Sequence, residues 1–239
     1  MSPAIPPAFE IAPGLWLRGP RPRLRDFGLV AFDMDSTLIA IECIDEIAAL
    51  AGVGEQVAAI TEAAMRGEIT DFRESLTRRL ALLEGQPEAL LDRVLNERLR
   101  LNPGARELCA ALKAAGLTLG LVSGGFTHFT RHVVAALGID VVRANELEIV
   151  NGRLTGRVRM QDWGDVVDGA EKRRFIEQHC ARLGLASTQA IAVGDGANDL
   201  PMMGVAGLSV AYCAKPRVRE QATVAIDDGG LARLLLALD

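Results

Sequence analysis

Short apolar runs alternate with helix-like segments along most of the chain. The run at residues 28–33 ends at an acid, and its unbroken apolar character suits a strand that is buried on both faces of a parallel sheet. Similar runs predict strands at residues 117–122, 189–193 and 208–212. Strand–helix alternation of this kind predicts an α/β fold, a doubly wound parallel sheet with helices on both faces.

Cap and turn residues mark where the elements between these strands begin and end. Asn102-Pro103 predicts the start of a helix over 105–115, with Asn102 as its cap and Gly116 as its stop. Comparable signals predict helices over 126–137 and 170–183, and a β-hairpin over 147–158 with Asn151-Gly152 in a type I′ turn.

Two segments differ from this alternating pattern. Residues 41–100 are rich in Ala, Leu, Glu and Arg, and their apolar residues recur at steps of three and four, which predicts a helical domain inserted after the first strand. Residues 1–25 hold six prolines and four arginines, and we expect an irregular arm there. The remaining residues, 26–40 and 101–239, form the predicted α/β core.

Composition and charge exclude several classes of function. The 239 residues carry a net charge of −5, which argues against a nucleic-acid partner. No run approaches the roughly 20 apolar residues that a membrane span needs. The N-terminus lacks the basic start and apolar run of a secretory signal, and the four cysteines form no C-x-x-C pair. We expect a cytoplasmic monomer or homodimer with reduced thiols.

Polar residues follow several of the predicted strands. Asp33 and Asp35 follow the first strand, Ser123-Gly124-Gly125 the second, and the run GDGAND at 194–199 the third. Lys172 lies near the start of the helix before that third strand. In open α/β sheets ligands bind outside the carboxyl ends of the strands, so these groups are expected to converge.

Such a group of residues favours phosphate chemistry with a magnesium ion. Clustered carboxylates without His or Cys nearby suit Mg²⁺ better than Zn²⁺. Asp33 is anionic at neutral pH and can attack phosphorus directly, whereas the glycine-rich turns and the Ser123 hydroxyl can hold a phosphate. Asp35 lies on the same side of the segment, where it can protonate an alcohol leaving group.

These residues resemble, in order, the four motifs of the haloacid dehalogenase superfamily of aspartate-nucleophile phosphotransferases. The strings DMDSTL, ECIDEIA, VSGGF and VGDGANDL are most similar to those of the phosphoserine phosphatase family. The resemblance implies Asp33 as nucleophile, Asp35 as general acid/base, and Mg²⁺ held by Asp33, the Asp35 carbonyl and Asp195. It further implies that the phosphoryl group is held by Ser123, Gly124, Lys172 and Asn198. Asp199 would support the metal shell or Lys172.

The same resemblance implies a substrate. The helical domain would be a cap that closes over the site, with Glu42 meeting a substrate ammonium, Arg79 a carboxylate, and Met65 and Phe72 forming apolar walls. The expected activity is hydrolysis of O-phospho-L-serine to L-serine and phosphate through an aspartyl-phosphate, the last step of serine biosynthesis.

Alternatives remain open. The chain could act on another small phosphomonoester or transfer the phosphoryl group to homoserine. It could also be a non-enzymatic receiver-like module that is phosphorylated on Asp33, although Asp35 and the cap argue against that. His128 and His132 lie four residues apart on a predicted helix, but no third metal ligand is evident. Ser123 lacks the G-x-S-x-G frame of a serine hydrolase.

Overall fold

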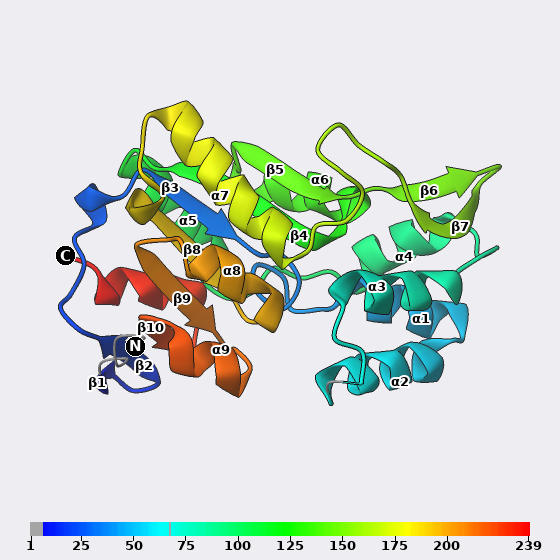
Figure 1. The fold of residues 1–239 in the computed structure, drawn as a ribbon, viewed down its shortest axis with the longest axis horizontal. Helices are drawn as coiled ribbons and strands as arrows, with labels where there is room; N and C mark the ends of the chain where they lie inside the picture. The colour runs from blue at the N-terminus through cyan, green and yellow to red at the C-terminus, as the bar shows by residue number, and fades with distance from the viewer. Residues whose placement is uncertain (1–6, 67) are drawn as a thin grey trace.

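The computed structural model describes residues 7–66 and 68–239, apart from the side chain of Met65 (Figure 1). Within these residues the main sheet has eight strands in the order β1-β2-β10-β9-β8-β3-β4-β5. The six strands from β10 to β5 run parallel, and β2 joins β10 antiparallel. The strands are β1 (Ala8–Ala12), β2 (Leu15–Arg18), β3 (Leu29–Phe32), β4 (Thr118–Phe126), β5 (Val141–Asn145), β8 (Ala190–Gly194), β9 (Leu208–Tyr212) and β10 (Val224–Ile226).

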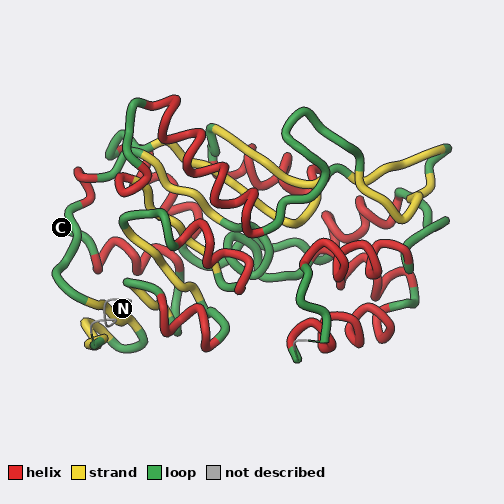
Figure 2. Tube along the Cα trace, viewed as in Figure 1, coloured by secondary structure: helices red, strands yellow, loops and turns green. Residues whose placement is uncertain are grey.

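Helices cover both faces of this sheet, as Figures 1 and 2 show. Two separate groups of buried apolar side chains fill the two interfaces. One face carries α5 (Ala105–Ala114), α6 (Thr127–Leu137) and η4 (Leu231–Ala237). The other carries α7 (Gly169–Leu183), α8 (Leu200–Met203) and α9 (Pro216–Gln221). The expected α/β architecture is therefore confirmed.

A helical segment follows β3 and lies at one end of the molecule (Figure 1). It consists of α1 (Cys43–Ala51), α2 (Gly54–Met65), α3 (Phe72–Ala81) and α4 (Ala89–Glu97). The predicted hairpin of β6 (Leu147–Val150) and β7 (Arg153–Val158) lies beside these helices. Asn151 and Gly152 have φ of 52° and 72°, the positive values that a type I′ turn requires.

The prediction of an irregular arm is wrong for residues 8–18, which form β1 and β2. Leu15 and Leu17 are buried on the sheet, and Gly14 turns the chain between the two strands at φ 69°. The high proline content of residues 1–25 indicated irregular structure. The prolines, however, lie outside both strands and do not interrupt their pairing. The first six residues of the predicted arm lie outside the described residues.

The predicted role of Asn102 is also wrong. Helix α5 begins after Gly104, which lies in the left-handed region at φ 76°, and no side chain caps it. The Asn102 amide instead donates hydrogen bonds to the carbonyl oxygens of Ser36, Thr37 and Ile39 at 3.4, 2.8 and 3.1 Å. Asn102 therefore fixes the loop that follows β3.

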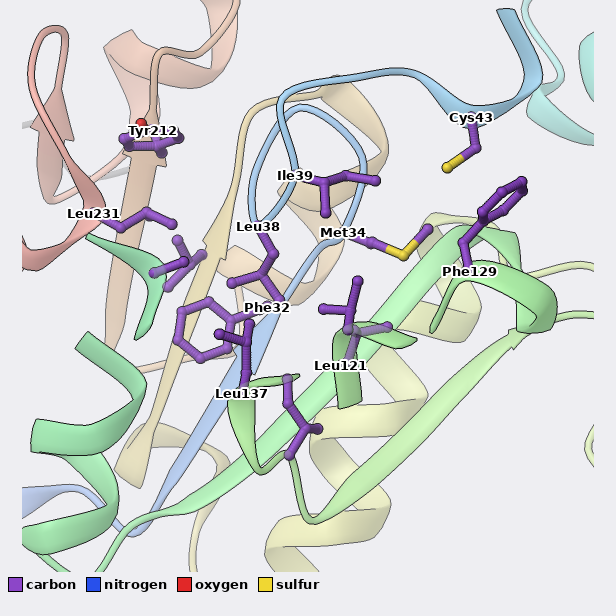
Figure 3. Packing of buried hydrophobic residues seen from close by; sticks show 14 of the residues in the cluster. Phe32, Met34, Leu38, Ile39, Cys43, Leu121, Phe129, Leu137, Tyr212 and Leu231 are labelled. Atoms are coloured by element: carbon purple, nitrogen blue, oxygen red, sulfur yellow. The ribbon is translucent and has the colours of Figure 1, made fainter. Parts of the chain in front are cut away.

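Apolar side chains anchor that loop to the core. Figure 3 shows Met34, Leu38 and Ile39 pointing from the loop into the buried cluster that also holds Phe32 and Leu121. All five side chains are fully buried. The polar residues between them are therefore held at the carboxyl edge of the sheet. No helix in the described part of the chain is long and apolar enough to span a bilayer.

Candidate active site

A cavity of about 160 Å³ lies where the carboxyl ends of β3, β4, β8 and β9 meet the helical segment. Asp33, Asp35, Asp195 and the glycine-rich turns all come from the ends of strands, because the parallel strands finish at this edge of the sheet. The lining residues are Asp33, Asp35, Glu42, Ile44, Phe72, Leu76, Arg79, Ser123, Gly124, Gly125, Phe126, Asp195, Gly196, Asn198 and Lys215. The structure thus brings together most of the side chains that the sequence singled out.

Asp33 shares a buried cation with Asp199. The Lys172 ammonium lies 2.8 Å from Oδ1 of Asp33 and 2.6 Å from Oδ1 of Asp199, and Lys172 is fully buried. Burial alone would lower the pKa of Lys172, but the two carboxylates raise it, so the ammonium stays charged. Burial raises the pKa of Asp33 to about 7 although Lys172 opposes that rise. The charge of Lys172 alone therefore does not compensate Asp33 for the loss of water around its carboxylate.

The pKa of Asp195 is raised as well, again mainly by burial. Oxygens of Asp33, Asp195 and Asp199 lie within 4.8 Å of one another. Burial, followed by the charges of Asp33 and Asp199, raises the pKa of Asp195 to about 8. Buried carboxylates that crowd together in this way fit a hard divalent cation with oxygen ligands.

The position of Asp199 sets it apart within this group. Its Oδ1 is bonded to Lys172, and its Oδ2 accepts the backbone N–H groups of Asp195 and Gly196 at 3.1 and 3.0 Å. The Thr37 hydroxyl donates to Oδ1 of Asp195 at 3.2 Å. Asp199 therefore supports the loop and the lysine, whereas Asp33 and Asp195 face the cavity.

Asp35 has one engaged and one unengaged carboxylate oxygen. The Cys43 N–H donates to Oδ2 at 3.2 Å, while Oδ1 is buried without a hydrogen-bond partner among the described residues. Burial, and then the charges of Glu42 and Asp33, raise the pKa of Asp35 well above its usual range. A carboxyl group whose pKa is raised in this way keeps its proton more readily than an ordinary aspartate, which suits a general acid.

The turn after Ser123 also lines the cavity. Ser123 pairs with Ala144 and Phe126 with Asn145, so the two glycines between them leave the β4–β5 ladder. The Gly125 N–H donates to the Ser123 hydroxyl at 2.9 Å. A Cβ on Gly124 would lie 2.8 Å from the Phe72 ring, so a larger residue here would displace that ring from its contact with the turn.

The helical segment contributes further residues to the cavity lining. Oε1 of Glu42 accepts the Ser36 hydroxyl at 2.7 Å, and Nε of Arg79 donates to the Ser75 carbonyl at 3.3 Å. Phe72, Leu76 and Ile44 add apolar walls. Met65 ends α2, but its side chain is outside the described residues, so its expected role stays a prediction.

Lys215 also lines the cavity, and the sequence interpretation missed it. It follows β9, and its N–H donates to the Asp195 carbonyl at 3.0 Å. Its charge reaches Glu42, where it opposes the rise in pKa that loss of water causes. Lys215 lies three residues beyond the predicted strand 208–212, so its place after a strand is the sequence signal that indicates it.

The histidine pair takes no part in the site. Nε2 of His128 lies 3.1 Å from Oδ1 of Asp92, which links α6 to α4. Among the described residues, the only group of potential metal ligands is Asp33, Asp195 and Asp199. The structure thus gives no support for a His128–His132 metal site.

Comparisons with known proteins agree with this geometry. Residues 30–204 match the family described as haloacid dehalogenase-like hydrolase. The chain is 63% identical to a phosphoserine phosphatase of Albidiferax ferrireducens, over 94% of this chain and 96% of the relative. It is 62% identical to a phosphoserine phosphatase of Polaromonas sp., over 95% of this chain and 97% of the relative.

Solved structures resemble the fold over a similar length. A phospho-aspartyl intermediate analogue of phosphoserine phosphatase has a TM-score of 0.82 and 38% identity, over 89% of this chain and 99% of the other. A substrate-bound phosphoserine phosphatase complex has a TM-score of 0.82 and 37% identity, with the same coverage.

Proposed function

The chain belongs to the haloacid dehalogenase-like hydrolases, and from this premise we propose that it hydrolyses O-phospho-L-serine to L-serine and phosphate. The main observation is that a single cavity is lined by Asp33 and by both Glu42 and Arg79. A carboxylate and a guanidinium there complement the ammonium and carboxylate of a free amino acid. The 63% identity to a phosphoserine phosphatase over nearly the whole chain supports this substrate. The reaction completes serine biosynthesis.

Asp33 is the proposed nucleophile. Its Oδ1 already accepts the Met34 N–H at 2.7 Å and contacts Lys172, so we assign the attack on phosphorus to Oδ2. A bond forms between Oδ2 and phosphorus as the bond from phosphorus to the serine oxygen breaks. Asp35 gives its proton to that departing oxygen, which leaves as the serine hydroxyl.

The second half of the reaction returns both acids to their starting states. Asp35, now a carboxylate, takes a proton from a water molecule whose oxygen attacks phosphorus. The bond from phosphorus to Asp33 breaks, and phosphate leaves. Because Asp35 promotes this step, the aspartyl-phosphate is short-lived, which distinguishes the proposed enzyme from a receiver-like module.

The crowded acids are consistent with Mg²⁺ as the cofactor. We assign its ligands to Asp33, Asp195 and the Asp35 carbonyl, and a supporting role to Asp199, whose oxygens are already engaged. Bound Mg²⁺ would offset the negative charge of these carboxylates and of the substrate phosphate. Ser123, Gly124, Lys172 and Asn198 are the proposed phosphoryl-binding residues, and Phe72 the proposed apolar wall.

We also propose that residues 41–100 form a cap domain over a core of residues 26–40 and 101–239. Phe72 on α3 reaches Gly124 at the end of β4, and Nη1 of Arg73 contacts Asp165 at 2.6 Å. These contacts join the helical segment to β4 and to the loop before α7, where a closing cap would exclude water.

A panel of phosphate esters tests the substrate. We expect the purified chain with Mg²⁺ to release phosphate from phosphoserine over many turnovers, and to prefer phosphoserine to sugar phosphates and to transfer onto homoserine. Asp33→Asn should retain the fold and lower turnover by at least about 10³-fold. Asp227→Asn, which changes an exposed partner of Arg219, is the matched control. Equal rates with sugar phosphates would overturn the substrate assignment.

A further inference from the structure

The β6–β7 hairpin is bonded to the helical segment by main-chain hydrogen bonds. The Gly85 N–H donates to the Leu154 carbonyl at 2.8 Å, and the Leu154 N–H to the Gln86 carbonyl at 2.9 Å. The Glu88 N–H donates to the Gly152 carbonyl at 2.9 Å. These bonds join the hairpin to the loop between α3 and α4, so the hairpin and the helical segment form one packed unit.

Asn145 is the last residue of β5 and lies at the base of this hairpin, two residues before β6 begins. It is fully buried. Its Nδ2 donates to the Gly124 carbonyl at 2.7 Å, and its Oδ1 accepts the Val167 N–H at 2.7 Å. Gly124 belongs to the proposed phosphoryl-binding turn, and Val167 lies on the segment that returns from the hairpin toward Lys172.

The side-chain amide is chemically suited to this position. The Asn145 amide lies between a carbonyl oxygen and an N–H group, so its nitrogen must donate a hydrogen bond and its oxygen must accept one. An aspartate would keep the bond to Val167 but place an oxygen against the Gly124 carbonyl. Because both partners are buried or half-buried, water does not readily replace a lost bond.

We propose that Asn145 is a positioning residue that sets the Gly124 turn for phosphoryl binding and ties it to the hairpin. This inference rests on the proposed function. Gly124 is held on one side by Phe72 of α3 and on the other by Asn145 at the hairpin base. Phe72 belongs to the unit of helical segment and hairpin, and Asn145 lies at the base of that hairpin. The position of this unit is therefore coupled to the position of the phosphoryl-binding turn.

Gln161 offers a matched control. Its Nε2 donates to the Ala144 carbonyl at 3.0 Å, so it joins the same two crossing segments through the same kind of bond. Unlike Asn145, it does not bond Gly124 in the described structure. Gln161→Ala therefore removes a tie at the hairpin base and leaves the phosphoryl turn intact.

The test measures inorganic phosphate binding by calorimetry in Mg²⁺, together with kcat and KM for phosphoserine, on the full chain. We expect Asn145→Asp and Asn145→Ser each to weaken phosphate binding at least about tenfold and to lower kcat, with Gln161→Ala within about twofold of wild type. Thermal melting of each variant separates loss of fold from loss of binding.

Two results would overturn the inference. The first is wild-type phosphate affinity in folded Asn145→Asp and Asn145→Ser. The second is an equal loss in Gln161→Ala, which would indicate a general effect of the hairpin base. If the wild-type chain binds phosphate but does not hydrolyse phosphoserine, the proposed function fails, whereas the binding comparison still tests Asn145.

Discussion

Nζ of Lys172 lies 2.8 Å from Oδ1 of Asp33, with the lysine wholly shielded from solvent. A second carboxylate, Asp199, shares the same ammonium at 2.6 Å. One cation therefore holds two acids beneath the cavity. Its removal would leave two buried negative charges without their partner, which is far costlier than the loss of an exposed ion pair.

Replacing Lys172 should therefore damage both stability and turnover. We expect Lys172→Met to lower the free energy of unfolding by about 3–5 kcal/mol, and to reduce phosphate release at least about 100-fold. Urea denaturation and a phosphate assay measure the two effects. Lys113→Met is the control, because Lys113 lies at the same 2.8 Å from Asp140 but is exposed, and it should cost less than about 1 kcal/mol. Equal losses in the two variants would contradict the role given to burial.

The raised pKa values of Asp33 and Asp195 predict a pH-dependent response to Mg²⁺. Both carboxyls have an ordinary pKa of 3.8, against about 7 and about 8 in the folded protein without metal. The folded state then binds more protons than the unfolded state between these values, so this contribution to stability is lost as pH rises through about 7 to 8. Mg²⁺ binds the deprotonated groups and should restore it.

Thermal melting with Mg²⁺ and with a chelator checks this prediction. The Mg²⁺-induced rise in Tm should be larger at about pH 8.5 than at about pH 6, and Mg²⁺ binding near pH 7 should release protons to the buffer. Asp195→Asn removes one titrating group and should flatten the trend. A Tm gain that shrinks as pH rises would refute the assignment.

Changing Glu42 should alter the choice of substrate rather than the chemistry. Glu42→Gln keeps the bond to Ser36 possible but removes the charge that would meet an ammonium. We expect kcat/KM for phosphoserine to fall about 10- to 150-fold, the loss typical of a hydrogen bond to a charged group. Glycerol phosphate, which has no ammonium, should not lose rate. Glu46→Gln, on the same helix, is the control, and a uniform loss on both substrates would sink the idea.

Arg79 should distinguish substrates by their carboxylate. Arg79→Met should reduce kcat/KM for phosphoserine about 10- to 150-fold, and leave phosphoethanolamine, which has no carboxylate, nearly unchanged. The neighbouring Arg78 pairs with the exposed Glu74 and does not line the cavity, so Arg78→Met controls for loss of a charge on α3. Steady-state kinetics on both esters decides the matter, and equal losses on the two would remove Arg79 from carboxylate recognition.

Much of the fold could be predicted from periodicity. The strand at residues 28–33 is β3, and the run at 208–212 coincides with β9. Both runs are mostly apolar because helices cover both faces of the sheet. The first two strands were missed because six prolines lie around them and indicate irregular structure.

The site was predictable where residues follow strands, and unpredictable where they act across the fold. Asp33, Ser123 and Asp195 were identified because each follows a buried run, and parallel strands bring their carboxyl ends together. Asn145 had no such signal, since its partners Gly124 and Val167 lie 21 and 22 residues away. Asn102 was misread because its local sequence fits a helix cap, yet its amide bonds a loop more than 60 residues distant.

The position of β3 between β4 and β8 has a consequence for synthesis of the chain. The strand that precedes Asp33 is translated before both of its partners, residues 118–121 and 190–193, which follow the helical segment in the sequence. Such distant pairing gives the core a high contact order, and its strand edges stay unpaired until both partners have been translated. A nascent chain that stops short of β8 therefore holds Asp33 and Asp35 but lacks Asp195, so the site can assemble only after β8 and the residues that follow it have been translated.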